Sequence, residues 1–258
     1  MRKNALLVAF AVALVFIGMG CDTIVTLDKP VVSAAALSTD NGGTLRLTWT
    51  AVTDAVSYEI TTDDSVYTTT STSFDVTTPS ATVEVAAVNG NDKSAAAVID
   101  CKVVETSSLI LYDKSDPDPN HPSGLAFTAS GSASAMSLVP ANQPSLDFAC
   151  DKVTVTPVGL VNAGDYGWSG NAKINTLMDA GTTDYDAFTE AAATGYTTQL
   201  STITNAVYAL WLSSSATWTA SDHFGKAKIV SVEDVGGYSK VTMTVAYQKI
   251  GGLRWLVK

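Results

Sequence analysis

The chain has 258 residues, of which 46% are hydrophobic and 16% charged, and its formal net charge is −10. An acidic chain has no electrostatic attraction for nucleic acid phosphates or for an anionic membrane surface, so nucleic acid is excluded as an expected partner. Thr, Ser and Val are frequent and Leu-rich helical periodicity is nearly absent, which favours a mainly β fold.

The first 20 residues have the composition of an export signal. Basic residues at 2–3 precede an apolar run at 5–19, which is too short to span a bilayer comfortably. The run ends in IGMGC (17–21), which resembles the bacterial lipoprotein signal, although Gly18 stands where that family usually has Leu. The resemblance implies that Cys21 is lipidated and anchors the protein to a membrane of the bacterial cell envelope, with the outer membrane or cell surface favoured. A plain secretory signal is the alternative, and both predict export.

Two cysteines remain after Cys21. An even pair in an exported chain is consistent with a disulfide between Cys101 and Cys150, which would close a loop of about 50 residues and contribute roughly 4 kcal/mol. Two buried free thiols are the alternative, because nothing in the local sequence shows that the side chains meet.

A tether at 21–29 leads into a first domain predicted at 30–104. Its hydrophobic alternation and turn residues predict a strand every 8 to 12 residues, which indicates a β-sandwich. The expected strands are 45–49, 55–60, 73–76, 82–88 and 95–99.

Two stretches of this domain, LRLTWTAVTDAVSYEI and ATVEVAAVNGNDKSAAAVI, resemble a fibronectin type III domain with Trp49 on its second strand. The departure lies at 81–82, where Ala and Thr replace a tyrosine that is frequent in the family, so its corner hydrogen bond is expected to be missing. The resemblance implies a spacer or interaction module.

Residues 105–258 are predicted as a second, β-rich domain with one short helix. The helix is expected at 183–193, because Thr can cap it, acidic residues fill its first turn and Gly195 can end it. The segments 113–124 and 162–171 are expected as loops. The expected strands are 108–112, 145–149, 153–156 and 206–212.

The chain also predicts a closing hairpin, with strands at 225–232 and 239–248 joined by a Gly-Gly turn at 236–237. The alternation divides its side chains into two faces. Lys226, Lys228, Lys240, Thr242 and Thr244 are expected to face water, and Ala227, Ile229, Val241, Met243 and Val245 are expected to face the core.

Three stretches of the second domain, LDFA (146–149), FGKAKI (224–229) and VAYQ (245–248), resemble the HmuY-like family of bacterial surface lipoproteins. The resemblance is strongest over about 206–256. Some members of that family bind haem, so haem becomes a candidate cofactor.

His121 and His223 are the two histidines of the chain, and haem iron accepts two axial imidazoles. Neither histidine falls on a ligand position of the HmuY-like pattern, so their assignment as haem ligands is a hypothesis from residue type. A solvated histidine beside a strand is the alternative.

An acidic loop spaces Asp113, Asp116, Asp118 and Asn120 in a way that offers oxygen ligands to Ca²⁺. Prolines interrupt the loop, and it lacks the glycine and the bidentate glutamate of an EF-hand. A solvated turn is the alternative.

Four tryptophans of the second domain are candidates for an aromatic platform, because amphipathic aromatic side chains mark binding surfaces. Trp211 and Trp255 lie in alternating strands and are predicted in the core. Trp168 and Trp218 lie in loop-like surroundings and are predicted as the aromatic surface, suited to a sugar or another flat ligand.

No nucleophile motif, metal-spaced histidine pair or phosphate-binding loop occurs, so catalysis is not expected. The predicted function is a non-catalytic, lipid-anchored envelope protein that binds haem or another flat small ligand through its second domain. The alternative is a structural or adhesive surface protein that binds a glycan or a protein partner.

Overall fold

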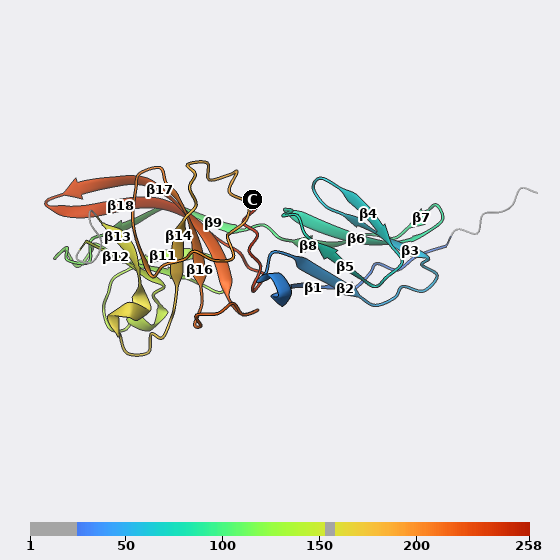
Figure 1. Cartoon of the computed structure of the whole chain (residues 1–258), viewed down its shortest axis with the longest axis horizontal. Helices are drawn as coiled ribbons and strands as arrows, with labels where there is room; N and C mark the ends of the chain where they lie inside the picture. Colours follow the sequence, from blue (N-terminus) through green and yellow to red (C-terminus); the bar gives the residue numbers. More distant parts are fainter. Residues whose placement is uncertain (1–24, 153–157) are drawn as a thin grey trace, which may run out of the picture.

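The computed structural model describes residues 25–152 and 158–258, and it places two β-rich domains end to end (Figure 1). Every paired strand in these ranges is antiparallel, which confirms the mainly β fold. No helix of the described chain is long and apolar enough to cross a membrane. The export signal, Cys21 and the strand predicted at 153–156 lie outside the described residues. Within residues 25–152 and 158–258, helical structure is limited to three short 3-10 turns, η1 (Ser38–Asp40), η2 (Gln143–Ser145) and η3 (Ala163–Tyr166).

The first domain is a β-sandwich. One sheet has the order β1-β2-β5, and the facing sheet has the order β4-β3-β6-β7, with β8 also paired to β6. Strict alternation puts Leu45, Leu47 and Trp49 inside, where Trp49 meets Tyr58 edge to face at 5.2 Å. The strands are β1 (Val32–Ala36), β2 (Leu45–Trp49), β3 (Ser57–Thr61), β4 (Val66–Thr69), β5 (Ser73–Val76), β6 (Thr82–Asn89), β7 (Asp92–Lys93) and β8 (Ala97–Asp100).

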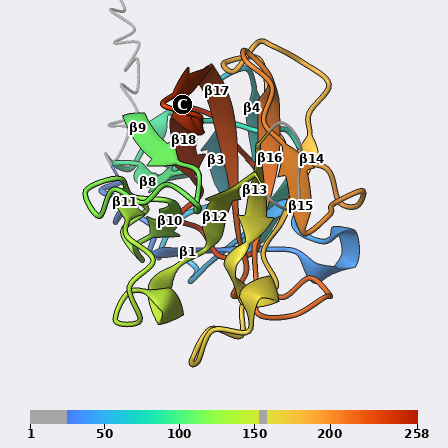
Figure 2. The same ribbon diagram turned by 90° about the vertical axis from the view of Figure 1, so that its left-hand side faces the viewer.

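The second domain packs two five-stranded sheets against one core (Figure 2). The first sheet has the order β14-β16-β17-β18-β9, and the second has the order β11-β10-β12-β13-β15. The strands are β9 (Val104–Tyr112), β10 (Gly124–Phe127), β11 (Ala133–Met136), β12 (Phe148–Asp151), β13 (Gly159–Asn162), β14 (Thr176–Asp179), β15 (Gln199–Ser201), β16 (Val207–Leu212), β17 (His223–Val235) and β18 (Tyr238–Tyr247).

The predicted closing hairpin is confirmed as β17 and β18. Val235 pairs with Tyr238 across a two-residue turn, and both turn glycines have positive φ, as a tight hairpin requires. The predicted inward face is also confirmed, because all five of its side chains are buried.

Two predictions are wrong for the same reason. Lys226 does not face water, and residues 183–193 do not form a helix. Lys226 is fully buried, because residues 183–193 fold over it. The helix predicted there is absent. The backbone carbonyls of Tyr185 and Phe188 accept hydrogen bonds from the Lys226 ammonium at 2.7 and 2.9 Å, in place of the backbone amide bonds that they would accept in a helix. A tertiary contact therefore overrides the local helical preference.

The last residues of the chain join the two domains. Leu253 and Trp255 belong to the core cluster of the first domain, and the Trp255 indole donates to the Gly43 carbonyl at 2.8 Å. At Gly42, φ is 86°, and a Cβ would lie 1.8 Å from the carbonyl oxygen of Gly252. The junction is therefore closely packed, and the first domain shares its core with the C-terminal segment.

The structure corrects the disulfide hypothesis in favour of free thiols. Cys101 lies in the core of the first domain and Cys150 in the core of the second, and both are free. Burial raises the pKa of Cys101 to about 12 and also raises that of Cys150, so both thiols stay protonated at neutral pH.

This arrangement predicts the outcome of a thiol titration. A Cys21→Ser variant is expected to show almost no reaction with Ellman's reagent in the native state, because both remaining thiols are buried and protonated. In denaturant, two thiols per chain should react without any reductant. Thiols that appear only after reduction would instead demonstrate a disulfide.

Candidate functional site

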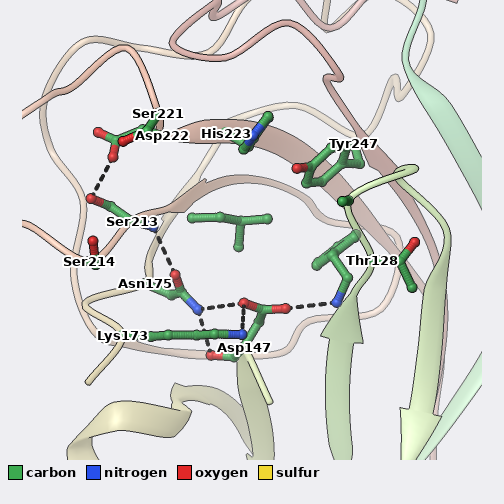
Figure 3. Close-up of a pocket in the computed structure, with 13 residues that line it drawn as sticks. Thr128, Asp147, Lys173, Asn175, Ser213, Ser214, Ser221, Asp222, His223 and Tyr247 are labelled. Atoms are coloured by element: carbon green, nitrogen blue, oxygen red, sulfur yellow. Dashed lines mark hydrogen bonds and ion pairs between the residues drawn. The ribbon is translucent and has the colours of Figure 1, made fainter. Parts of the chain in front are cut away.

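Two cavities of the second domain share the loop 213–222 between β16 and β17. We call them the His223 pocket and the aromatic cleft. The His223 pocket has a volume of about 250 Å³ and lies between the ends of β10, β16, β17 and β18 (Figure 3). The aromatic cleft is larger, with a volume of about 610 Å³.

His223 begins β17 and forms one wall of its pocket. Its Nδ1 lies 2.9 Å from the Gln248 carbonyl oxygen, and since a carbonyl only accepts, Nδ1 carries the hydrogen. An imidazole that is neutral and carries its hydrogen on Nδ1 has its lone pair on Nε2, which is how a histidine is oriented when it binds a metal. The ring stacks on Tyr247 at 4.7 Å, and Tyr247 stacks in turn on Phe127 at 5.6 Å.

The polar groups on the opposite side of this pocket bind one another (Figure 3). The Asp147 carboxylate accepts from Lys173 Nζ at 2.8 Å, from Asn175 Nδ2 at 3.0 Å and from the Phe127 amide at 2.7 Å. Burial and the charge of Asp147 raise the pKa of Tyr247 to about 12, so its hydroxyl stays protonated. This wall offers a structural network rather than a free base.

Asp222 organises the loop that both cavities share. One carboxylate oxygen accepts from the hydroxyls of Ser213 and Thr219, each at 2.8 Å. The other accepts from the Thr219 amide at 2.8 Å and from the Trp211 indole at 2.9 Å. Asp222 is only 2% exposed, so these bonds fix both the loop and the plane of Trp211.

The aromatic cleft is lined by Tyr196, Trp211 and Trp218. Trp218 donates from its indole nitrogen to the Gly252 carbonyl at 2.9 Å, and Tyr196 donates from its hydroxyl to the Ala192 carbonyl at 3.0 Å. Tyr196 meets Trp211 edge to face at 5.6 Å. The polar tips of all three rings are therefore bonded to protein.

Part of this cleft was predicted from the sequence. Trp218 lines it, as the surface prediction requires, whereas Trp168 lies elsewhere, stacked on Tyr166 at 4.7 Å. Trp211 packs on Phe224 and also lines the cleft, so its assignment to the core describes only one of its faces. Tyr196 was missed, because it lies in an irregular segment without periodicity.

The structure does not bring the two histidines together. His121 lies in a separate cavity with Asp116 and Asp118, and its Nδ1 is 2.7 Å from an Asp116 oxygen. Its ring stacks on Tyr112 with centroids 3.7 Å apart. None of the cavities found among the described residues is lined by both histidines.

The acidic loop forms local turns. Asp113 accepts from Ser115, and Asp116 accepts from the Asp118 amide at 3.0 Å. Asp118 accepts from the backbone and side chain of Asn120 at 2.9 and 3.0 Å. These are Asx turns, and the described residues contain no group of three or more His, Cys, Asp or Glu able to hold a metal. The loop is only partly a solvated turn, because Asp113 is fully buried and its Oδ2 has no hydrogen-bond partner among the described residues, so calcium binding by this loop stays a prediction.

Comparison with known proteins gives similarity to solved structures alone. No family model and no curated protein matches the chain. A solved structure titled "Structure of FN3tt mut" is similar at 26% sequence identity, over 29% of this chain and 92% of that chain, with a TM-score of 0.25.

Proposed function

We propose that the chain is a non-catalytic, lipid-anchored envelope protein whose second domain binds a small ligand. In this proposal the acyl chains on Cys21 hold it to the outer membrane or cell surface. The fibronectin type III-like first domain serves as a spacer, and the HmuY-like second domain carries the ligand. The aromatic cleft is the main support, because its volume of about 610 Å³ falls within the ~300–1,000 Å³ typical of small-molecule sites.

Haem is the sharpest candidate ligand, and two sites are available for it. The His223 pocket supplies an imidazole whose Nε2 is free, and its volume of about 250 Å³ would admit only part of a porphyrin. The aromatic cleft supplies stacking surfaces without an axial ligand among the described residues that line it. Either mode would make the chain a haem-binding protein.

A haemin titration followed by absorbance tests this proposal. We expect a saturable shift of the Soret band. If the imidazole of His223 coordinates the iron, His223→Ala should weaken haemin binding at least tenfold. If the porphyrin instead stacks in the aromatic cleft, Trp218→Ala should weaken it by the same factor. His121→Ala is the matched control, because that side chain lies in another cavity. A folded protein that gives no saturable change would rule out haem.

An adhesive role is the second candidate. Asn41 of the first domain lines the cleft together with residues of the second, so the site lies at the junction of the two domains. A surface protein that presents such a junction to the outside is suited to a glycan or to a protein partner.

A further inference from the structure

The aromatic cleft carries no charge. Among the described residues that line it there is no Asp, Glu, Lys, Arg or His, although the whole chain has 40 acidic and basic residues. Buried ionised groups require a partner charge or dense hydrogen bonding. A ligand whose charged groups enter the cleft would find no charge of opposite sign among these residues, so the cleft is suited to a molecule, or part of one, that is neutral.

The cleft combines aromatic faces with hydroxyl groups. The rings of Tyr196, Trp211 and Trp218 supply the apolar surface. Thr176 also lines the cleft, but its Oγ1 is buried beneath the surface, so the hydroxyls that a ligand can meet belong to other residues. Further side-chain hydroxyls in the lining come from Thr194, Thr198, Ser215 and Thr217.

The aromatic rings are held before any ligand arrives. Asp222 fixes Trp211, and the Gly252 carbonyl fixes Trp218. Gly252 also permits the close approach of Trp218, because a Cβ there would lie 2.6 Å from the ring. Rings that are already ordered lose little conformational entropy on binding, which raises affinity.

We propose that the aromatic cleft is a binding site for a neutral saccharide. A pyranose ring has an apolar C–H face that stacks on an indole and an edge of hydroxyls that pair with Thr, Ser and Asn. This inference rests on the proposed ligand-binding function and names its ligand class. It assigns Trp211 and Trp218 as stacking surfaces and Thr198 as a polar contact.

The test uses the full chain and isothermal titration with maltotetraose, cellotetraose and chitotetraose as neutral probes, and with 3′-sialyllactose as an anionic one. We expect saturable binding of a neutral tetrasaccharide, with an affinity that changes less than twofold between 50 and 500 mM salt, because no charge pair contributes. Trp218→Ala should weaken binding at least tenfold. Thr198→Val, which keeps the shape of a side chain that lines the cleft, should weaken it about fivefold, as expected for one hydrogen bond of about 1 kcal/mol.

Two matched variants control for folding. Trp168→Ala and Thr244→Val change the same residue types outside the cleft and should leave the affinity within twofold. Failure of all three neutral probes to bind the folded chain would overturn the saccharide site, as would equal losses in the cleft and control variants. Haemin binding without saccharide binding would overturn this inference alone. If the folded chain binds neither haemin nor any of the saccharides, the proposed ligand-binding function is overturned as well.

Discussion

Replacing Trp255 by alanine is expected to lower the free energy of unfolding of the first domain by about 3–5 kcal/mol, the usual cost of truncating a buried tryptophan. Trp255 is fully buried and belongs to the core cluster of that domain, although it lies 206 residues after Trp49 in the sequence. Its indole also satisfies the Gly43 carbonyl at 2.8 Å. The alanine variant leaves both a cavity and an unpaired acceptor.

Native-state hydrogen exchange on peptides from β2 and β6 measures this effect in the first domain alone. Trp255→Phe separates the two contributions, because it keeps most of the apolar surface and loses the indole bond, and it should cost about 1–2 kcal/mol. Trp168→Ala, at a half-buried site of the second domain, should leave β2 and β6 unchanged. A change below about 1 kcal/mol for Trp255→Ala would show that the first domain folds independently of the C-terminal segment.

The parts of the fold that were predicted correctly depend on local patterns. The β17–β18 hairpin combines alternation over both strands with a Gly-Gly turn, and each of these signals is contained within a few residues. Five of the eight strands of the first domain were found in the same way, from alternation in segments such as 45–49, whereas β1, β4 and β7 were not predicted.

The errors arise where distant segments meet. Residues 183–193 have a good helical composition, but their carbonyls bind Lys226, about 40 residues away. Alternation correctly predicted that Trp255 is a core residue. It could not indicate that this core is that of the first domain. The cleft joins residues from five separate stretches, including Asn41 and Tyr196, so no spacing in the sequence predicts it.

The buried lysine gives the protein a characteristic dependence on pH. Burial is the main cause that lowers the pKa of Lys226 from 10.5 to about 8, the charge of Lys258 lowers it further, and Asp186, Glu105 and Asp184 oppose the shift. Between pH 8 and 10.5 the unfolded chain binds a proton that the folded chain has lost. The free energy of unfolding therefore rises with pH in this window, by about 3 kcal/mol at 1.36 kcal/mol per pKa unit.

Subtracting the unfolding profile of Lys226→Met from that of the wild type isolates this contribution from other groups that titrate in the same window. Urea unfolding at pH 7, 8, 9, 10 and 10.5 should give a difference that is flat below pH 8 and rises by about 3 kcal/mol above it. Lys228→Met, two residues along the same strand and half-buried, should follow the wild type. Parallel profiles for wild type and Lys226→Met would mean that the ammonium keeps its ordinary pKa. In that case the two carbonyl contacts at 2.7 and 2.9 Å would compensate fully for the loss of water around a buried charge.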